Sequence, residues 1–438
     1  MQVLDWMRDT LWGDDVRRTR TVISLVFLAL SIVFLVGVWY WGGDTEVMRD
    51  RWRNASTLFS GSLPVMEYPP LALIFIAIPR IFASTVWGYE IGWVVMLFVV
   101  FVVGLEMISR TARTLGYSQR KAMWIYAVLM IIMLEFVIDR FDAIAMVLSL
   151  GALLLFLQKR YPWAFVVLAV ATLVKVYPAV MFPVMLICLA RSEGLKGAAK
   201  GFLAYAATGI LVVAVCWIID PDVITNFLSY NTDRPLQIES SAASIVYFLS
   251  RAGLSDWWIQ PAVDVGAYGS VNLRGDMADA VADTILPLTV AVTVIVWLLY
   301  AVKAFRGSRE PDMRLMALAC LASVLVFVAF NKVYSTQYTI WFYAPFMLVL
   351  IMSGRRFGDR MAWLMIANAA LGLLNYIFSY KILNADEFTD AGMLILLTRN
   401  AVTVILLCLT VREMWRCGTG RDDPPESAPA VTPADRAD

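Results

Sequence analysis

The chain has 438 residues, of which 60% are hydrophobic, 13% are aromatic and only 16% are charged. That much apolar surface cannot be buried in the core of a soluble domain, so the composition excludes a water-soluble globular protein and predicts a polytopic membrane protein. The net charge of +1 says little about how the chain lies in the membrane, because orientation depends on which loops carry the charges and not on their total.

The first apolar run follows Arg17, Arg18 and Arg20 and lacks a small-residue cleavage pattern, so we expect it to remain as a signal anchor. The apolar runs of spanning or near-spanning length predict an all-α integral membrane fold of about twelve transmembrane helices. They cover 21–41, 89–109, 122–138, 142–157, 162–175, 178–190, 201–219, 284–304, 315–331, 338–353, 361–379 and 391–411.

The positions of the basic clusters agree with this count, because Lys and Arg accumulate in cytoplasmic loops. With a cytoplasmic start, every basic cluster falls on the cytoplasmic side, provided that residues 69–88 do not cross. Pro79 and the charged Arg80 make 69–88 a poor straight span, so we expect a re-entrant or juxtamembrane helix in the first outer loop. Residues 162–190 are expected to form two short helices broken around Lys175-Val176-Tyr177-Pro178 near the outer face.

These spans divide the chain into three parts. Residues 1–20 are an expected cytoplasmic N-terminus, and 21–417 are a transmembrane domain with outer loops at 43–88 and 220–283. Residues 418–438 are rich in Pro, Ala, Asp and Glu and predict a disordered cytoplasmic tail.

Polar side chains from loops that are far apart in sequence gather at the expected outer face. They include Asp44, Glu46, Glu67, Asp139, Arg140, Asp142, Lys175, Tyr177, Arg234, Lys332 and Gln337. Charges near membrane depth are costly unless they are paired, hydrated or functional. The plainer alternatives are a self-satisfied ion network at Asp139-Arg140-Phe141-Asp142, a snorkelling Lys175, and an interfacial anchor at Lys332.

The outer loop at 220–283 adds two kinds of group. Arg234 can bind a phosphate bidentately, and Trp257 and Trp258 offer either stacking faces for a sugar ring or anchors in the headgroup layer. The chain has no histidine, so any acid–base step falls to carboxylates, tyrosines or lysines. The five cysteines have no paired spacing, and we expect no metal site and no cofactor.

Taken in order, these motifs resemble the polytopic C-type glycosyltransferases that use a polyprenyl-phosphate sugar, specifically glycosyltransferase family 87, which includes mannosyltransferases. The markers are Asp44, Glu67-Tyr68-Pro69-Pro70-Leu71, Arg140-Phe141-Asp142, Lys175-Val176-Tyr177-Pro178, Asp233-Arg234-Pro235-Leu236-Gln237-Ile238-Glu239-Ser240, and Lys332-Val333-Tyr334-Ser335-Thr336-Gln337-Tyr338 with Trp341. The resemblance covers nearly the whole chain up to the tail. In one departure, relatives commonly carry a histidine where this chain has Asn231, which bears on donor affinity or donor identity.

The resemblance implies a C-type glycosyltransferase fold and an inverting membrane enzyme. The enzyme would move a sugar, mannose by this likeness, from a polyprenyl-phosphate donor to a lipid-linked or cell-envelope glycan on the outer face of the cell membrane, as in lipoglycan biosynthesis. Asp44 is the expected general base, and Lys175, Arg234, Lys332 and Asn231 are expected to bind the donor phosphate. The expected substrate-binding residues are Glu67, Tyr68, Arg140, Asp142, Tyr177, Gln237, Glu239, Gln337 and Trp257.

This chemistry agrees with the residues. A sugar phosphate has a leaving group that is stable as an anion, so one carboxylate is enough to take the proton of the acceptor hydroxyl. The alternative from another class is a secondary transporter or flippase for a polar or lipid-linked substrate, since broken helices and buried charges also mark transport pathways. Against it, the polar groups concentrate at the outer face and no repeat relates the two halves. A membrane scaffold would leave the outer charges without a purpose.

Overall fold

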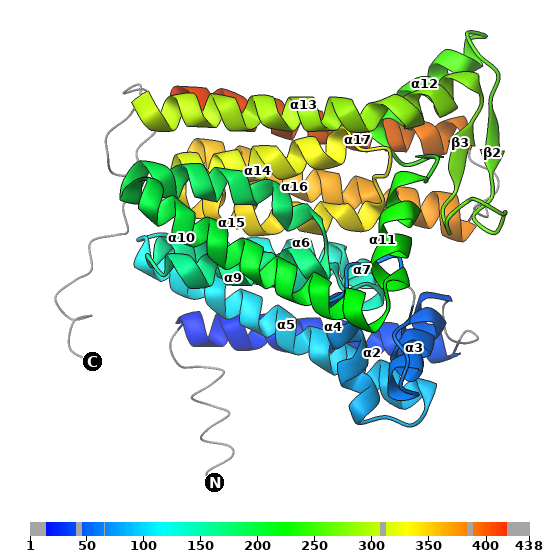
Figure 1. Cartoon of the computed structure of the whole chain (residues 1–438), viewed down its shortest axis with the longest axis horizontal. Helices are drawn as coiled ribbons and strands as arrows, with labels where there is room; N and C mark the ends of the chain where they lie inside the picture. The colour runs from blue at the N-terminus through cyan, green and yellow to red at the C-terminus, as the bar shows by residue number, and fades with distance from the viewer. Residues whose placement is uncertain (1–14, 41–45, 65, 307–311, 383–388, 418–438) are drawn as a thin grey trace.

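The computed structural model describes residues 15–40, 46–64, 66–306, 312–382 and 389–417. Long helices lie side by side along one direction, and a smaller group of short elements covers one end (Figure 1). The helices are α2 (Asp15–Tyr40), α3 (Glu46–Phe59), α4 (Ala72–Ile81), α5 (Val86–Thr114), α6 (Gln119–Ile132), α7 (Leu134–Asp139), α8 (Asp142–Leu157), α9 (Tyr161–Val174), η1 (Tyr177–Met181), α10 (Phe182–Ile219), α11 (Asp222–Thr232), α12 (Ser241–Arg251), α13 (Asp276–Arg306), α14 (Met313–Ala329), η2 (Thr336–Phe342), α15 (Tyr343–Met352), α16 (Arg355–Tyr376), η3 (Ile377–Ile382) and α17 (Asp390–Arg416).

Within the described ranges, six helical segments are long and apolar enough to cross a bilayer. They are Asp15–Tyr40, Val86–Thr114, Tyr177–Ile219, Asp276–Arg306, Arg355–Ser379 and Asp390–Arg416. Shorter apolar helices of 10–17 residues lie among them, including α8, α9 and α14. This is the pattern of an all-α membrane protein, as the composition predicted, whereas the count of twelve crossings stays a prediction.

The described part of the segment that is predicted to be the first outer loop contains two helices, α3 and α4. The 10-residue helix α4 is about 15 Å long, roughly half the thickness of the hydrocarbon core, and it contains Pro79. Its length fits the expectation that this segment does not cross, although a re-entrant path stays a prediction. The helix α3 was not expected, and it packs against α4 through Arg80, whose guanidinium lies 4.7 Å from the centre of the Trp52 ring.

Helix α10 is interrupted at Gly194, where φ is 73° and ψ is −176°. Only glycine adopts this backbone conformation readily, so the chain turns there and α10 consists of two limbs. The sequence placed a cytoplasmic connection between 190 and 201, which agrees with the position of this turn.

Residues 220–283 differ most from the expected outer loop. They form α11, β1 (Leu236–Gln237), α12, β2 (Trp258–Gln260), β3 (Asn272–Arg274) and the start of α13, with the strands antiparallel in the order β1-β3-β2. Leu236 and Leu273 pair across the sheet and are buried in a small second core with side chains of α12 and α17. Strands of two or three residues are too short to give an alternating pattern, which is why the sequence did not reveal them.

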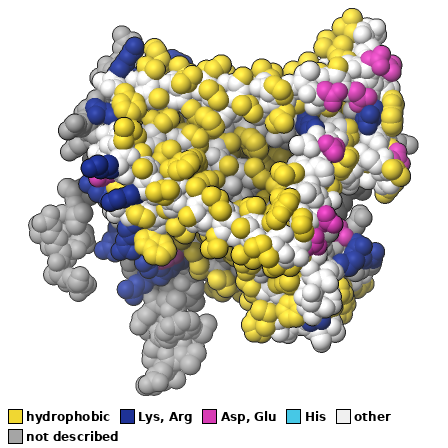
Figure 2. Space-filling model, viewed as in Figure 1, with side chains coloured by type: hydrophobic (Ala, Val, Ile, Leu, Met, Phe, Trp, Pro, Cys, Tyr) yellow, Lys and Arg dark blue, Asp and Glu magenta, His cyan; other side chains and the backbone are white. Residues whose placement is uncertain are grey.

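The two ends of the bundle differ in charge. Interactions of basic residues join the helix ends at one side: Arg120 with Asp15, Lys121 with Asp359, Arg191 with the Ala304 carbonyl, Lys303 with the Trp415 carbonyl, and Arg314 with Glu413. Figure 2 shows Lys and Arg gathered along this end and Asp and Glu concentrated at the other. The two are called here the basic end and the acidic end. The positive-inside rule predicts that the basic end faces the cytoplasm.

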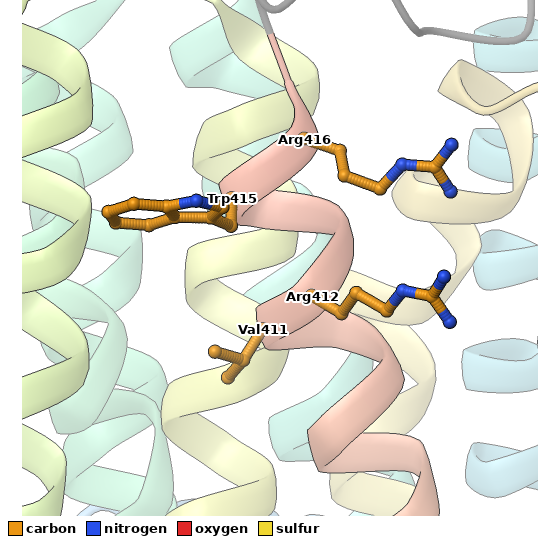
Figure 3. Close-up of a pocket in the computed structure, with 4 residues that line it drawn as sticks. All are labelled: Val411, Arg412, Trp415 and Arg416. Carbon is orange, nitrogen blue, oxygen red and sulfur yellow. The ribbon is translucent and has the colours of Figure 1, made fainter.

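A depression at the basic end is lined by Val411, Arg412, Trp415 and Arg416, which project from two sides of α17 (Figure 3). It lies at the opposite end of α17 from Asp390, which bonds Tyr247 of the acidic end.

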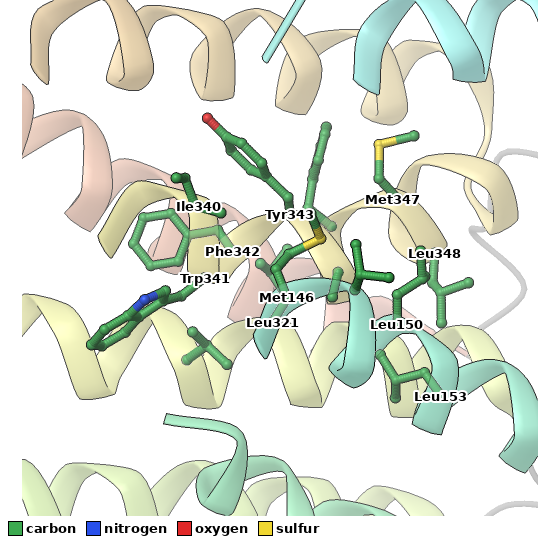
Figure 4. Packing of buried hydrophobic residues seen from close by; sticks show 14 of the residues in the cluster. Met146, Leu150, Leu153, Leu321, Ile340, Trp341, Phe342, Tyr343, Met347 and Leu348 are labelled. Atoms are coloured by element: carbon green, nitrogen blue, oxygen red, sulfur yellow. The ribbon is translucent and has the colours of Figure 1, made fainter. Parts of the chain in front are cut away.

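The main core fixes the helices that lead to the acidic end. Met146 and Leu150 of α8, Leu321 of α14, and Phe342 and Met347 of η2 and α15 are almost completely buried and lie near one another (Figure 4). Close packing of this kind leaves little freedom to the residues at the ends of these helices, which include Asp142 and Trp341.

Candidate active site

A buried ion pair lies at the first residue of α8. Asp142 has no exposed surface, and its Oδ1 and Oδ2 each lie 3.3 Å from the Nζ of Lys175, which follows the last residue of α9. The Nε1 of Trp341 donates a hydrogen bond of 2.5 Å to Oδ1. The Lys175 side chain is only 12% exposed, so it points into the protein and does not snorkel to water.

Aromatic rings surround this pair. The Lys175 ammonium lies 4.7 Å from the ring centre of Phe141, 5.1 Å from that of Tyr68 and 5.9 Å from that of Trp341. Trp341 in turn stacks on Tyr177 at 4.7 Å and on Tyr338 at 3.7 Å. Ring faces of this kind can hold both a cation and the apolar face of a sugar.

Glu67 and Tyr68, from the segment predicted as the first outer loop, lie near this ion pair. Burial, and after it the negative charge of Glu67, holds the pKa of the Tyr68 phenol well above its ordinary value. Tyr68 therefore stays protonated at neutral pH and can donate a hydrogen bond but cannot act as a base. Arg140 interacts electrostatically with Tyr68 and Glu67, and its Nε lies 3.7 Å from Asp139 Oδ2.

Two further cations approach from the other side. Arg234, just after α11, lies 5.3 Å from the ring centre of Tyr230, and its Nε is buried without a hydrogen-bond partner. Lys332, in the loop after α14, donates a 2.6 Å hydrogen bond to the carbonyl oxygen of Thr232. Burial lowers the pKa of Lys332, and the charge of Arg234 lowers it further, while Asp283 and Asp233 oppose the shift. In the described part of the chain, neither cation has a carboxylate within 4 Å.

The amide of Asn231 has a structural contact. Its Nδ2 donates hydrogen bonds to the carbonyl oxygens of Glu67, at 3.2 Å, and Phe227, at 2.8 Å. Asn231 therefore ties α11 to the first outer loop, and both of its amide hydrogens are used in this structure. Tyr338 interacts electrostatically with Arg234, Asp142 and Glu67, so its hydroxyl lies near both the ion pair and Arg234.

The charged and aromatic residues described so far are called the charged cluster: Glu67, Tyr68, Arg140, Asp142, Lys175, Arg234, Lys332, Tyr338 and Trp341. Gln237 and Glu239 contact the residues next to this cluster. Gln237 donates to Ser335 Oγ at 2.7 Å and accepts from the Tyr334 backbone N–H at 2.9 Å. Glu239 forms a buried ion pair with Arg399, at 3.3 Å, and accepts from Thr336 Oγ1 at 3.0 Å. Both hold residues 334–336 in place, and their expected contact with substrate stays a prediction.

The sequence did not single out Arg399 or the pair of Arg51 and Glu90. Arg399 is completely buried in α17, and its guanidinium lies 3.9 Å from the ring centre of Tyr334. Arg51 of α3 lies 2.8 Å from Glu90 of α5 and 3.7 Å from Asp139. A charge within an apolar run, as at 399 and 90, was the signal that could have revealed them.

The other expected site residues are placed as follows. Gln337 is half-buried in η2, next to Tyr338. Trp257 packs edge-on against Tyr247 at 5.0 Å, within the small second core and not in the cluster. Asp44 lies outside the described residues, so its role as the base stays a prediction.

The comparison with known families agrees with the membrane helices. The model of glycosyltransferase family 87 matches residues 66–330, more than half of the chain. The chain belongs to glycosyltransferase family 87. It is therefore a membrane glycosyltransferase, as its motifs suggested. No curated protein sequence matches it.

The matched region of this family 87 enzyme contains Glu67, Asp142, Lys175 and Arg234. Lys332, Trp341 and Arg399 lie beyond it, and Asp44 lies before it. The structure nevertheless brings Lys332 and Trp341 into contact with the matched region, through Thr232 and Asp142 respectively.

Proposed function

We propose that the chain transfers a sugar from a polyprenyl-phosphate donor to a glycan or glycolipid acceptor, with inversion, on the outer face of the cell membrane. The proposed sugar is mannose, from the likeness to the mannosyltransferases of the family. The proposed topology has twelve crossings, with the basic end in the cytoplasm and the charged cluster outside.

One observation carries the proposal of a phosphate-linked donor. Most other described cations of the acidic end have carboxylate partners: Lys175 has Asp142, Arg51 has Glu90, Arg251 has Asp390 and Arg274 has Asp279. Arg80 has no carboxylate partner in the described chain but lies over the rings of Trp52 and Phe59. Arg234 and Lys332 have none among the described residues, although they repel each other. Two neighbouring partly buried cations are best explained by an anion that binds between them, and a phosphate accepts charge-assisted hydrogen bonds from both.

The reaction follows from this charge distribution. The acceptor hydroxyl oxygen attacks the anomeric carbon, and a new carbon–oxygen bond forms as the bond from that carbon to the phosphate oxygen breaks. The proton of the hydroxyl passes to a carboxylate of the first outer loop, for which Asp44 is the proposed base. Polyprenyl phosphate leaves with the bonding electrons, and Arg234 and Lys332 stabilise the added negative charge.

The ion pair of Asp142 and Lys175 has a different proposed part. Because the two charges neutralise each other, the pair adds little attraction for a phosphate. Asp142 is also an unsuitable base, since both of its oxygens lie against the Lys175 ammonium. We propose that the pair and the rings of Tyr68, Tyr177 and Trp341 form the wall against which the transferred sugar lies.

Purified protein in liposomes tests the proposal. It should transfer mannose from polyprenyl-phosphate mannose to a lipoglycan acceptor, with the opposite anomeric configuration in the product, and should not use a nucleotide-linked mannose. Transfer only from the nucleotide sugar, or retention of configuration, would exclude this mechanism. Movement of the unreacted substrate across the liposome membrane would instead support a transporter.

A further inference from the structure

One aromatic ring of the acidic end is exposed at the surface of the protein. Trp258, the first residue of β2, is 51% exposed, although Trp257 beside it is packed against Tyr247. In the described chain, no other aromatic ring packs against Trp258. Its neighbour across the sheet is Arg274, which pairs with it in register and lies 5.9 Å from its ring centre.

Charged side chains that can form hydrogen bonds lie next to the Trp258 ring. The Nε of Arg274 lies 2.8 Å from Asp279 Oδ1, and its Nη2 donates to Asp279 Oδ2 at 3.2 Å. The Nη1 of Arg274 donates to Gln260 Oε1 at 3.4 Å. The side chain of Asp279 is 43% exposed, so its oxygens can accept hydrogen bonds from a ligand on the ring.

We propose that Trp258, Arg274 and Asp279 form a subsite for the glycan chain of the acceptor. The apolar face of a sugar ring stacks on an indole, while a carboxylate and a guanidinium at its edge bind the hydroxyl groups. This assignment rests on the proposed function for the statement that the bound glycan is the acceptor.

The surrounding charge favours a glycan over a lipid headgroup. Asp256 and Asp264 lie in the loops that flank β2, and Asp276 and Asp279 lie in the first turn of α13, so carboxylates outnumber the nearby Arg251 and Arg274. Figure 2 shows acidic side chains concentrated at this corner. An anionic headgroup is repelled by such a surface, whereas a neutral glycan is not. Trp258 is therefore assigned to sugar binding and not to anchoring in the bilayer.

The position of the sheet also suits an acceptor. The other edge strand of the sheet, β1, contacts the charged cluster, because the backbone N–H of Gln237 donates a 3.0 Å hydrogen bond to the carbonyl oxygen of Lys332. With β3 between β1 and β2, Trp258 lies about 10 Å across the sheet from that strand. The subsite therefore contacts a sugar that is some residues away from the hydroxyl that reacts.

Direct binding tests the subsite without any transfer step. Binding of linear manno-, gluco- and arabino-oligosaccharides to the detergent-solubilised full chain is measured by calorimetry for wild type, Trp258→Ala, Trp258→Phe and Asp279→Asn. The matched control is Trp363→Ala, which removes an indole that is 72% exposed on α16. With the oligosaccharide that the wild type binds best, we expect about tenfold weaker binding for Trp258→Ala, a smaller loss for Trp258→Phe, and no change for Trp363→Ala.

In the transfer assay, Trp258→Ala should raise the KM for a long acceptor about tenfold and leave kcat unchanged. Equal oligosaccharide binding by wild type and Trp258→Ala, or no binding of any of the three by the wild type, overturns the subsite. Quenching of Trp258 fluorescence by brominated lipid would overturn it in favour of a membrane anchor. Failure of the wild type to use polyprenyl-phosphate mannose, with oligosaccharide binding intact, would reject the proposed donor and leave the subsite standing.

Discussion

Lys175 Nζ lies 3.3 Å from both carboxylate oxygens of Asp142. Asp142 is the first residue of α8, whereas Lys175 follows the last residue of α9. The pair is almost completely buried, so each charge depends on the other. Removing one partner of a buried pair typically costs about 3–5 kcal/mol, because the remaining charge has no counter-ion.

Asp142→Asn should therefore lower the thermal unfolding midpoint strongly, since the amide keeps the contact with Trp341 but leaves Lys175 unpaired. The double variant Asp142→Asn/Lys175→Met should recover much of the loss, which thermal unfolding of the detergent-solubilised protein would reveal. Additive losses in the double variant would mean that the two side chains stabilise the fold independently.

The buried Arg399 should affect the donor site indirectly, through the residues that it holds in place. Its guanidinium donates to Glu239 Oε2, to the Tyr334 carbonyl and to Asn400 Oδ1, contacts that one ammonium cannot reproduce. Arg399→Lys should keep the fold but loosen residues 332–337, and so raise the donor KM several-fold while the unfolding midpoint changes little.

The matched control for Arg399→Lys is Arg314→Lys, which alters an ion pair with Glu413 at the basic end. It should leave the donor KM unchanged. Equal effects of the two variants would show that Arg399 acts on overall stability only.

The apolar runs were enough to predict the class and the positions of most long helices. The segment at 69–88 was set apart from the spans because Pro79 and Arg80 disagree with a straight crossing; the structure has a 10-residue helix there, and the absence of a crossing stays a prediction. The broken segment at Lys175 was found from the conflict between a lysine and its apolar neighbours. These are local signals, which a single sequence carries.

What the sequence could not reveal depends on contacts between distant residues. Asp142 and Lys175 were both predicted as site residues, but nothing in either motif indicated that they neutralise each other. The ion pair of Glu239 with Arg399 could not be predicted, because Arg399 lies 160 residues away in an apolar run. Trp257 and Trp258 are both tryptophans of one loop, and only the contact with the second core distinguishes the partly buried Trp257 from the exposed Trp258.

The proposed topology places α3 and the sheet outside and the Gly194 turn inside. Single cysteines at Ser60 and Val265, in a background without the five native cysteines, should react with an impermeant thiol reagent added to intact cells, since both positions are exposed. A cysteine at Leu195, which is 84% exposed, should react only after the cells are opened. Labelling of Ser60 and Val265 from opposite sides would separate the first outer loop from the sheet and exclude a shared site.

Asp44→Asn tests the base. The amide keeps the shape but cannot take a proton, so the transfer rate should fall by about 10²- to 10⁴-fold while donor binding is retained. Asp50→Asn, on the exposed side of α3, removes a carboxylate of the same loop and should transfer at the normal rate. Near-normal turnover of Asp44→Asn, with loss in Glu67→Gln, would move the role to Glu67.

The KM for polyprenyl-phosphate mannose in the single variants Arg234→Ala and Lys332→Ala, with Arg251→Ala as control, tests the central claim most directly. Arg251 is a cation of the same end that is already paired with Asp390. Hydrogen bonds to a charged group contribute about 1.5–3 kcal/mol, so loss of either unpaired cation should raise the donor KM by roughly 10- to 100-fold, and Arg251→Ala should not change it. An unchanged donor KM in both variants, or an equal rise in the control, would contradict a donor phosphate held between Arg234 and Lys332.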